Sequence, residues 1–192
     1  MSLLHNTASD KGAHLVFCYA TEDAPLVEEL RKHLFGLRKK GHTEWGEWAI
    51  EPGAHTDNVI AEQLEKADII LLMLSAPFLA HRLEALRPYL WRESGKGQAV
   101  LVPILANACN WKAETRLEGR QLLPRCGDPL HKHRQQSKLL ADIARELAVL
   151  IETLEKERAQ LQIEQASAWT PTVEDDVVLY MGHPVSYTHL RA

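Results

Sequence analysis

The sequence lacks several features that mark particular classes of protein. Its longest apolar run, residues 69–74, is only strand-sized, whereas a membrane-spanning helix needs roughly 18–20 apolar residues. It also lacks an excess of basic residues, because 22 lysines and arginines against 26 aspartates and glutamates give a formal charge of −4. A nucleic-acid-binding surface would normally be basic. We therefore expect neither a membrane nor a nucleic acid among the partners of this chain.

Cysteine is scarce, and its placement argues against a disulfide framework or a metal site. Cys18, Cys109 and Cys126 show no paired spacing and leave one cysteine over. Reduced thiols are typical of cytoplasmic proteins, and the amino terminus lacks the basic and then long apolar segments of a signal peptide. Cys126 precedes His131 and His133, but no fourth ligand stands at a suitable spacing. We expect a cytoplasmic protein without a bound metal.

What the sequence does contain is an alternation of strand-like and helix-like segments. Hydrophobic residues make up 45% of the chain, which suffices for a core. Short apolar runs predict strands at residues 14–19, 43–50, 68–74 and 99–105. Helical spacing of apolar residues predicts helices at 25–40, 56–66, 78–93 and 135–165, with a short helix possible at 113–121. This alternation predicts an α/β, flavodoxin-like three-layer fold with a parallel sheet and a long C-terminal helix.

The chain divides into one domain with two flanking segments. Residues 1–12 are polar and aperiodic and are expected to form a flexible leader, whereas 13–155 form the domain. Residues 156–192 continue the last helix and end in an unstructured tail, with projection of the polar half of the helix favoured over pairing as a coiled coil. Residues 185–192 look like translated library-adaptor sequence, in which case they are not native and the natural protein continues further.

Candidate ligand-binding residues follow the predicted strands. Residues 14–23, HLVFCYATED, read as a buried strand that ends in an acidic turn, which places Tyr19 and Asp23 at the carboxyl edge of the sheet. Asp23 is also suited to cap the following helix, and Tyr19 to lie in the core. Ser75 ends the third strand and either contacts a ligand or simply makes a turn. Pro52 and Gly53 either let a loop fold over a ligand or dock on a neighbouring molecule, or they only form the turn.

Several short motifs together resemble one protein family. The chain is similar to bacterial Toll/interleukin-1 receptor (TIR) domains over about residues 14–155. The resemblance rests on the first-strand motif at 17–23, the start of a loop at 50–53 after tryptophans 45 and 48, the strand exit at 75–80, and blocks at 102–105, 110–111 and 122–124. Each motif alone is weak, but their order is fairly specific to the family.

The resemblance implies a fold and one of two functions. The fold would be a five-stranded parallel sheet with helices on both faces. Some TIR domains hydrolyse or cyclise NAD as effectors in bacterial immunity, whereas others only assemble with one another or with partners to pass a signal. The resemblance further implies self-association, a possible sensor partner, NAD as substrate rather than cofactor, and an NAD site that includes Tyr19, Asp23, Pro52, Gly53 and Ser75.

The catalytic members carry a glutamate on the helix after the third strand, and here the sequence departs from their pattern. Nicotinamide departure leaves an oxocarbenium-like ribose, which a carboxylate stabilises. The family's glutamate would stand near residues 86–88, where this chain has Leu-Arg-Pro, and the S-x-W-C segment before it is replaced at 81–83. The nearest carboxylate, Glu84, lies about one helical turn, or ~5.4 Å, earlier. Glu84 is therefore the candidate catalytic residue, and an ordinary surface carboxylate is the alternative.

Overall fold

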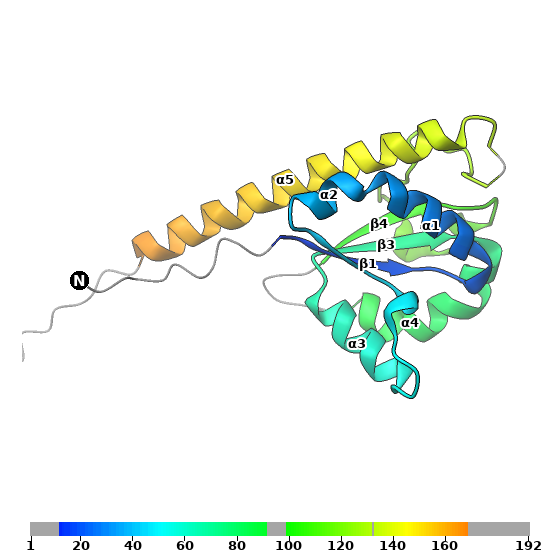
Figure 1. The fold of residues 1–192 in the computed structure, drawn as a ribbon, viewed down its shortest axis with the longest axis horizontal. Coiled ribbons are helices and arrows are strands. Elements are labelled where there is room, and N and C mark those ends of the chain that lie inside the picture. Colours follow the sequence, from blue (N-terminus) through cyan, green and yellow to red (C-terminus); the bar gives the residue numbers. More distant parts are fainter. Residues whose placement is uncertain (1–11, 92–98, 132, 169–192) are drawn as a thin grey trace, which may run out of the picture.

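Four parallel strands form the central layer of the fold (Figure 1). The computed structural model describes residues 12–91, 99–131 and 133–168. The strands are β1 (His14–Cys18), β2 (Thr43–Trp45), β3 (Ile69–Leu74) and β4 (Val100–Leu105), in the spatial order β2-β1-β3-β4. All neighbouring pairs are parallel. The predicted parallel α/β fold is therefore confirmed.

Helices cover both faces of this sheet, because its strands are apolar on both sides. Residues of β1 alternate between the two cores: Leu15 and Phe17 pack on one face, Val16 and Cys18 on the other. The first face is covered by α1 (Ala24–His33), α2 (Phe35–Lys39) and α5 (Gln136–Ala168). The second is covered by α3 (Thr56–Lys66), the π-helical turn η3 (Phe78–Arg82) and α4 (Leu83–Leu90).

The described sheet has four strands, so the predicted count of five is wrong for this part of the chain. Leu123 lies where a strand beyond β4 would pair, but it makes only an isolated parallel bridge with Ile104. Its N–H donates to the Pro103 carbonyl at 2.9 Å, and its carbonyl accepts from Leu105 N–H at 2.7 Å. The bridge does not extend because the Leu105 carbonyl, the next acceptor along β4, accepts from Leu130 N–H instead, at 3.0 Å.

The second strand is also shorter than predicted. It ends at Trp45, and the 3₁₀ turn η2 (Glu47–Ala49) replaces the rest. Gly46, between the two, allows the Trp48 ring to fold back over the backbone, since a Cβ at Gly46 would lie 2.2 Å from the ring.

Two helical segments also differ from a simple reading of the sequence. The helix α4 continues through Pro88 to Leu90, so this proline does not split the helix. The predicted short helix at 113–121 is absent as such; 3₁₀ turns stand at Trp111–Ala113 and Thr115–Leu117.

The long helix α5 packs on the sheet and then continues past it (Figure 1). An ion pair near the end of its packed part joins Arg158 to Asp68 at 2.5 Å, just before β3. Beyond that pair, Leu161 and Ile163 are 54% and 63% exposed, as expected for a projecting helix. No helix in the described residues is long and apolar enough to cross a membrane. Most of the expected leader and the tail that includes 185–192 lie outside the described residues.

Candidate functional site at the carboxyl edge of the sheet

A buried hydrogen bond joins the ends of the two central strands. Asp23 closes the turn η1 (Thr21–Asp23) after β1, and Ser75 directly follows β3. Ser75 Oγ donates to Asp23 Oδ2 at 2.5 Å and accepts from Phe78 N–H at 3.2 Å. Asp23 is 7% exposed and Ser75 is fully buried. Asp23 precedes α1, but its side chain does not cap that helix, because the carboxylate is engaged by Ser75 instead.

This setting changes the acid–base behaviour of Asp23. Burial raises the pKa of the carboxyl above its usual 3.8, and the neighbouring Glu22 charge adds to the rise. The hydrogen bond from Ser75 opposes the rise because it stabilises the ionised form. A carboxyl group with a raised pKa, placed at the ligand-binding edge of a parallel sheet, can give or take a proton closer to neutral pH.

Aromatic side chains form a wall that joins the end of β1 to η2. The rings of Tyr19 and Trp48 are stacked, with centroids 6.0 Å apart, and Phe17 meets Trp48 edge-on at 5.5 Å. The guanidinium carbon of Arg31 lies 4.1 Å from the centroid of the Trp48 ring, a cation–π contact. Burial raises the pKa of Tyr19, and the charge of Glu47 contributes in the same direction. These contacts hold η2 against the end of β1.

An ion pair crosses from this wall to the segment after β3. Glu47 of η2 pairs with Arg82 at the end of η3, and both side chains are partly exposed. Burial raises the pKa of the Cys18 thiol to about 12, and the Arg82 charge opposes that rise while the Glu47 charge adds to it. The pair therefore lies close enough to the end of β1 to influence its last residue. Cys18 itself stays a neutral thiol at neutral pH.

The predicted loop residues and the predicted catalytic residue lie apart from Asp23 and Ser75. Pro52 and Gly53 are exposed in the turn before α3, where Gly53 has a φ of 89° that favours glycine. Glu84 is 75% exposed on α4 and accepts a hydrogen bond from Arg87 Nε at 2.8 Å. Among the described residues, no hydrogen bond or ion pair joins these three residues to the Asp23–Ser75 pair.

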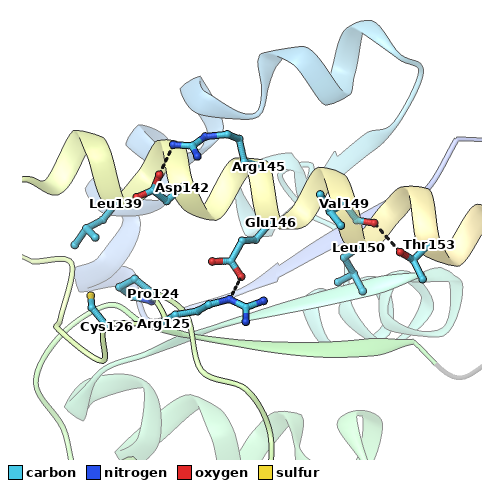
Figure 2. A pocket seen from close by; sticks show the side chains of 10 residues that line it. All are labelled: Pro124, Arg125, Cys126, Leu139, Asp142, Arg145, Glu146, Val149, Leu150 and Thr153. Carbon is cyan, nitrogen blue, oxygen red and sulfur yellow. Dashed lines mark hydrogen bonds and ion pairs between the residues drawn. The ribbon is translucent and has the colours of Figure 1, made fainter.

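A separate groove lies between α5 and the loop that follows the Leu123 bridge (Figure 2). Its volume is about 680 Å³, and it contains none of the residues that the sequence predicts for the site. Two ion pairs line it, Arg125 with Glu146 at 2.6 Å and Arg145 with Asp142. The described residues hold no cluster of three or more side chains suited to a metal ion.

The comparisons with known proteins agree with this architecture. A family model described as a TIR domain matches residues 16–140, well over half of the chain. The chain belongs to the TIR domain family. The uncharacterised protein y4lF of Sinorhizobium fredii is similar to this TIR domain, with 31% identity over 119 residues. That match covers 59% of this chain and 36% of y4lF, so the chain spans about a third of the relative's length.

A solved structure is also similar to this TIR domain. It is the TIR domain of the Toll-related receptor TRR-2 from Hydra magnipapillata. The two chains are 19% identical, with a TM-score of 0.44, over 57% of this chain and 82% of the other. The family predicted from the sequence motifs is thus confirmed by the match over residues 16–140.

Sequence reasoning missed the charged members of the site. Arg82 pairs with Glu47, and Arg31 lies over the ring of Trp48, so each reaches its partner from another element only in the folded protein. Trp48 was noted as part of a family motif, but its stacking on Tyr19 was not foreseen. The one local signal was Gly46, a glycine between Trp45 of β2 and Trp48 of η2, which marks a close approach to the backbone.

Proposed function

We propose that this TIR domain hydrolyses NAD to nicotinamide and ADP-ribose, or a cyclic form of it, when several copies assemble. In hydrolysis the bond between nicotinamide and the ribose C1′ breaks and its electron pair leaves with nicotinamide. Water then bonds to C1′ and releases a proton. The observation that carries the proposal is the buried Asp23–Ser75 hydrogen bond at the carboxyl edge of the sheet, where ligands of such folds bind.

Glu84 is the proposed stabiliser of the ribose cation. Glu84 lies on α4, which follows β3 and η3 in the chain. Ser75 and Glu84 therefore belong to the same segment that leads away from the end of β3. The Glu84 side chain is exposed and therefore weakly effective in the isolated domain, because water screens its charge. A second TIR domain that covered α4 would remove this water. We therefore place the active form of the site in an assembly, with exposed Pro52 and Gly53 contributing to the ligand or to the neighbour.

The test is nicotinamide release from NAD by purified protein that is artificially clustered. The parent should release nicotinamide, and Glu84→Gln should abolish release while the fold is retained. Glu62→Gln is the matched control, because Glu62 is likewise an exposed helical glutamate, paired with Lys66. Equal activity of parent and Glu84→Gln would reject the role of Glu84. Absence of release from the clustered parent would reject the enzymatic proposal.

A second function is a non-catalytic module that transmits a signal through TIR–TIR contacts or a partner protein. The observation in its favour is that Glu84, whose side chain is 75% exposed, pairs with Arg87, which also pairs with Glu114 at 2.9 Å. The exposed Glu84–Arg87 ion pair is typical of a protein surface rather than of a reaction centre. Self-association without nicotinamide release would support this function.

A further inference from the structure

Arg82 occupies an unusual position for a surface arginine. It ends the π-helical turn after β3, and its side chain reaches Glu47 in the 3₁₀ turn after β2. The contact therefore spans the carboxyl edge of the sheet beside β1, whose last residue, Cys18, is influenced by the Arg82 charge. This edge is where parallel α/β sheets bind ligands. A cation thus lies at the position where a ligand would enter.

The hydrogen-bonding capacity of Arg82 is only partly used. Its Nη2 donates to Glu47 Oε1, but its Nε–H is buried and has no hydrogen-bond partner in the part of the chain that the structure describes. A buried donor without an acceptor costs free energy, which an incoming acceptor would recover. The guanidinium presents its donors as a planar fork that matches two oxygens of a phosphate.

The Arg82 side chain as a whole is partly exposed to solvent. The Arg82 side chain is 28% exposed and that of Glu47 is 35% exposed, so the pair is neither sealed inside nor fully solvated. A partly buried cation attracts an anion more strongly than a fully exposed one, because less water screens it. Glu47 occupies only one edge of the fork in this structure.

We infer that Arg82 binds the diphosphate of a dinucleotide, and that phosphate oxygens replace the Glu47 carboxylate when the ligand enters. The choice of a dinucleotide rests on the proposed NAD-hydrolysing function. The Nε–H and one Nη–H would donate to two phosphate oxygens. Asp23 and Ser75 follow β1 and β3 at the same edge of the sheet. Glu47 then acts as a competitor that holds Arg82 in place until a ligand arrives.

This arrangement predicts effects of opposite sign for the two partners of one ion pair. Arg82→Gln removes the anion-binding group and should weaken binding of ADP-ribose by about tenfold or more. Glu47→Gln removes the competitor and should tighten binding severalfold. Arg82→Lys keeps the charge without the fork and should fall between the parent and Arg82→Gln. A pair that only supported the fold would instead weaken binding in both variants.

The experiment is calorimetric titration of each variant with ADP-ribose, inorganic pyrophosphate and nicotinamide riboside. ADP-ribose and pyrophosphate should follow the opposite-sign pattern, and nicotinamide riboside, which has no phosphate, should bind all variants alike. Arg125→Gln and Glu146→Gln are matched controls, because this pair also links two segments but lies at the groove beside α5 (Figure 2). Neither control should change binding.

The outcomes separate this inference from the proposed function. Pyrophosphate binding that depends on Arg82, without nicotinamide release from the clustered parent, supports the inference and rejects hydrolysis. Nicotinamide release with unchanged ADP-ribose affinity in Arg82→Gln supports hydrolysis and overturns the inference. Weaker binding in both Arg82→Gln and Glu47→Gln, or no pyrophosphate binding by the folded parent, also overturns it.

Discussion

Two parts of this TIR domain carry candidate carboxylates, and the two carboxylates differ in burial and in their partners. At the ends of β1 and β3, Asp23 is 7% exposed and accepts a hydrogen bond from a fully buried serine. On α4, Glu84 is 75% exposed and pairs with an arginine three residues away. The first carboxylate is part of the tertiary structure, whereas the second depends only on its own helix. A substitution of Asp23 should therefore change the free energy of unfolding, whereas a substitution of Glu84 should leave it almost unchanged.

Trp48→Ala should give the largest loss of stability, because the indole ties η2 to Tyr19, Phe17 and Arg31. We expect the free energy of unfolding to fall by about 3 kcal/mol, the lower end for a large aromatic side chain, since Trp48 is 38% exposed. Urea unfolding at pH 7 measures the change.

Phe35→Ala is the control for Trp48→Ala. Phe35 is 56% exposed and also meets a cation, Lys39, at 5.4 Å. Its loss should cost much less, because little buried area goes with it. Equal losses in the two variants would mean that η2 is not anchored by its tryptophan.

Ser75→Ala should give the next largest loss. The variant leaves the buried Asp23 carboxylate without its hydrogen-bond donor, so the free energy of unfolding should fall by about 2 kcal/mol. Ser137→Ala, on the exposed first turn of α5, should change it by less than about 0.5 kcal/mol. If the two alanine variants were equally stable, Asp23 and Ser75 would not form a buried bond in solution.

Asp23→Asn should have a smaller effect that depends on pH. The folded-state pKa of Asp23 is raised, so the parent has its full stabilisation below the usual value of 3.8 and loses it as the pH rises through the folded pKa. An asparagine does not titrate. The stability of Asp23→Asn relative to the parent should therefore increase from pH 4 to pH 7.

Urea unfolding of the parent and of Asp23→Asn at pH 4, 5, 6 and 7 measures this difference in the free energy of unfolding. Asp57→Asn, at an exposed position in the first turn of α3, should not show the same increase. If the stability of Asp23→Asn relative to the parent decreased toward pH 7 instead, the hydrogen bond from Ser75 would affect the pKa of Asp23 more than burial does.

The sequence predicts the elements that depend on local patterns. The apolar run of β3 and the periodic helix α5 were located to within three residues, since burial and periodicity determine them directly. The shortened β2 and the missing fifth strand were not foreseen. Gly46 and Leu130 explain the two differences, but the effect of each depends on a neighbour, Trp48 for one and the Leu105 carbonyl of β4 for the other.

The site was predictable only in part, for the same reason. Strand ends identified Asp23 and Ser75, because parallel strands bring their carboxyl ends to one edge. The role of Asp23 as a helix cap was wrong, because a serine 52 residues away takes its carboxylate. Arg82 and Glu47 are 35 residues apart, and no local spacing relates them. Motifs and periodicity identify which residues lie at the carboxyl edge of the sheet, but the partner of each side chain depends on the tertiary structure.

Glu84→Gln should have the smallest effect on stability and is the sharpest check of the comparison between the two carboxylates. An exposed ion pair contributes little, and Arg87 keeps its second partner, Glu114, in the variant. The free energy of unfolding should change by less than about 0.5 kcal/mol, measured in urea at pH 7. A loss comparable to that of Ser75→Ala would place Glu84 inside the structure. A negligible loss lets any change in nicotinamide release be assigned to chemistry or assembly, because the fold would be unaffected.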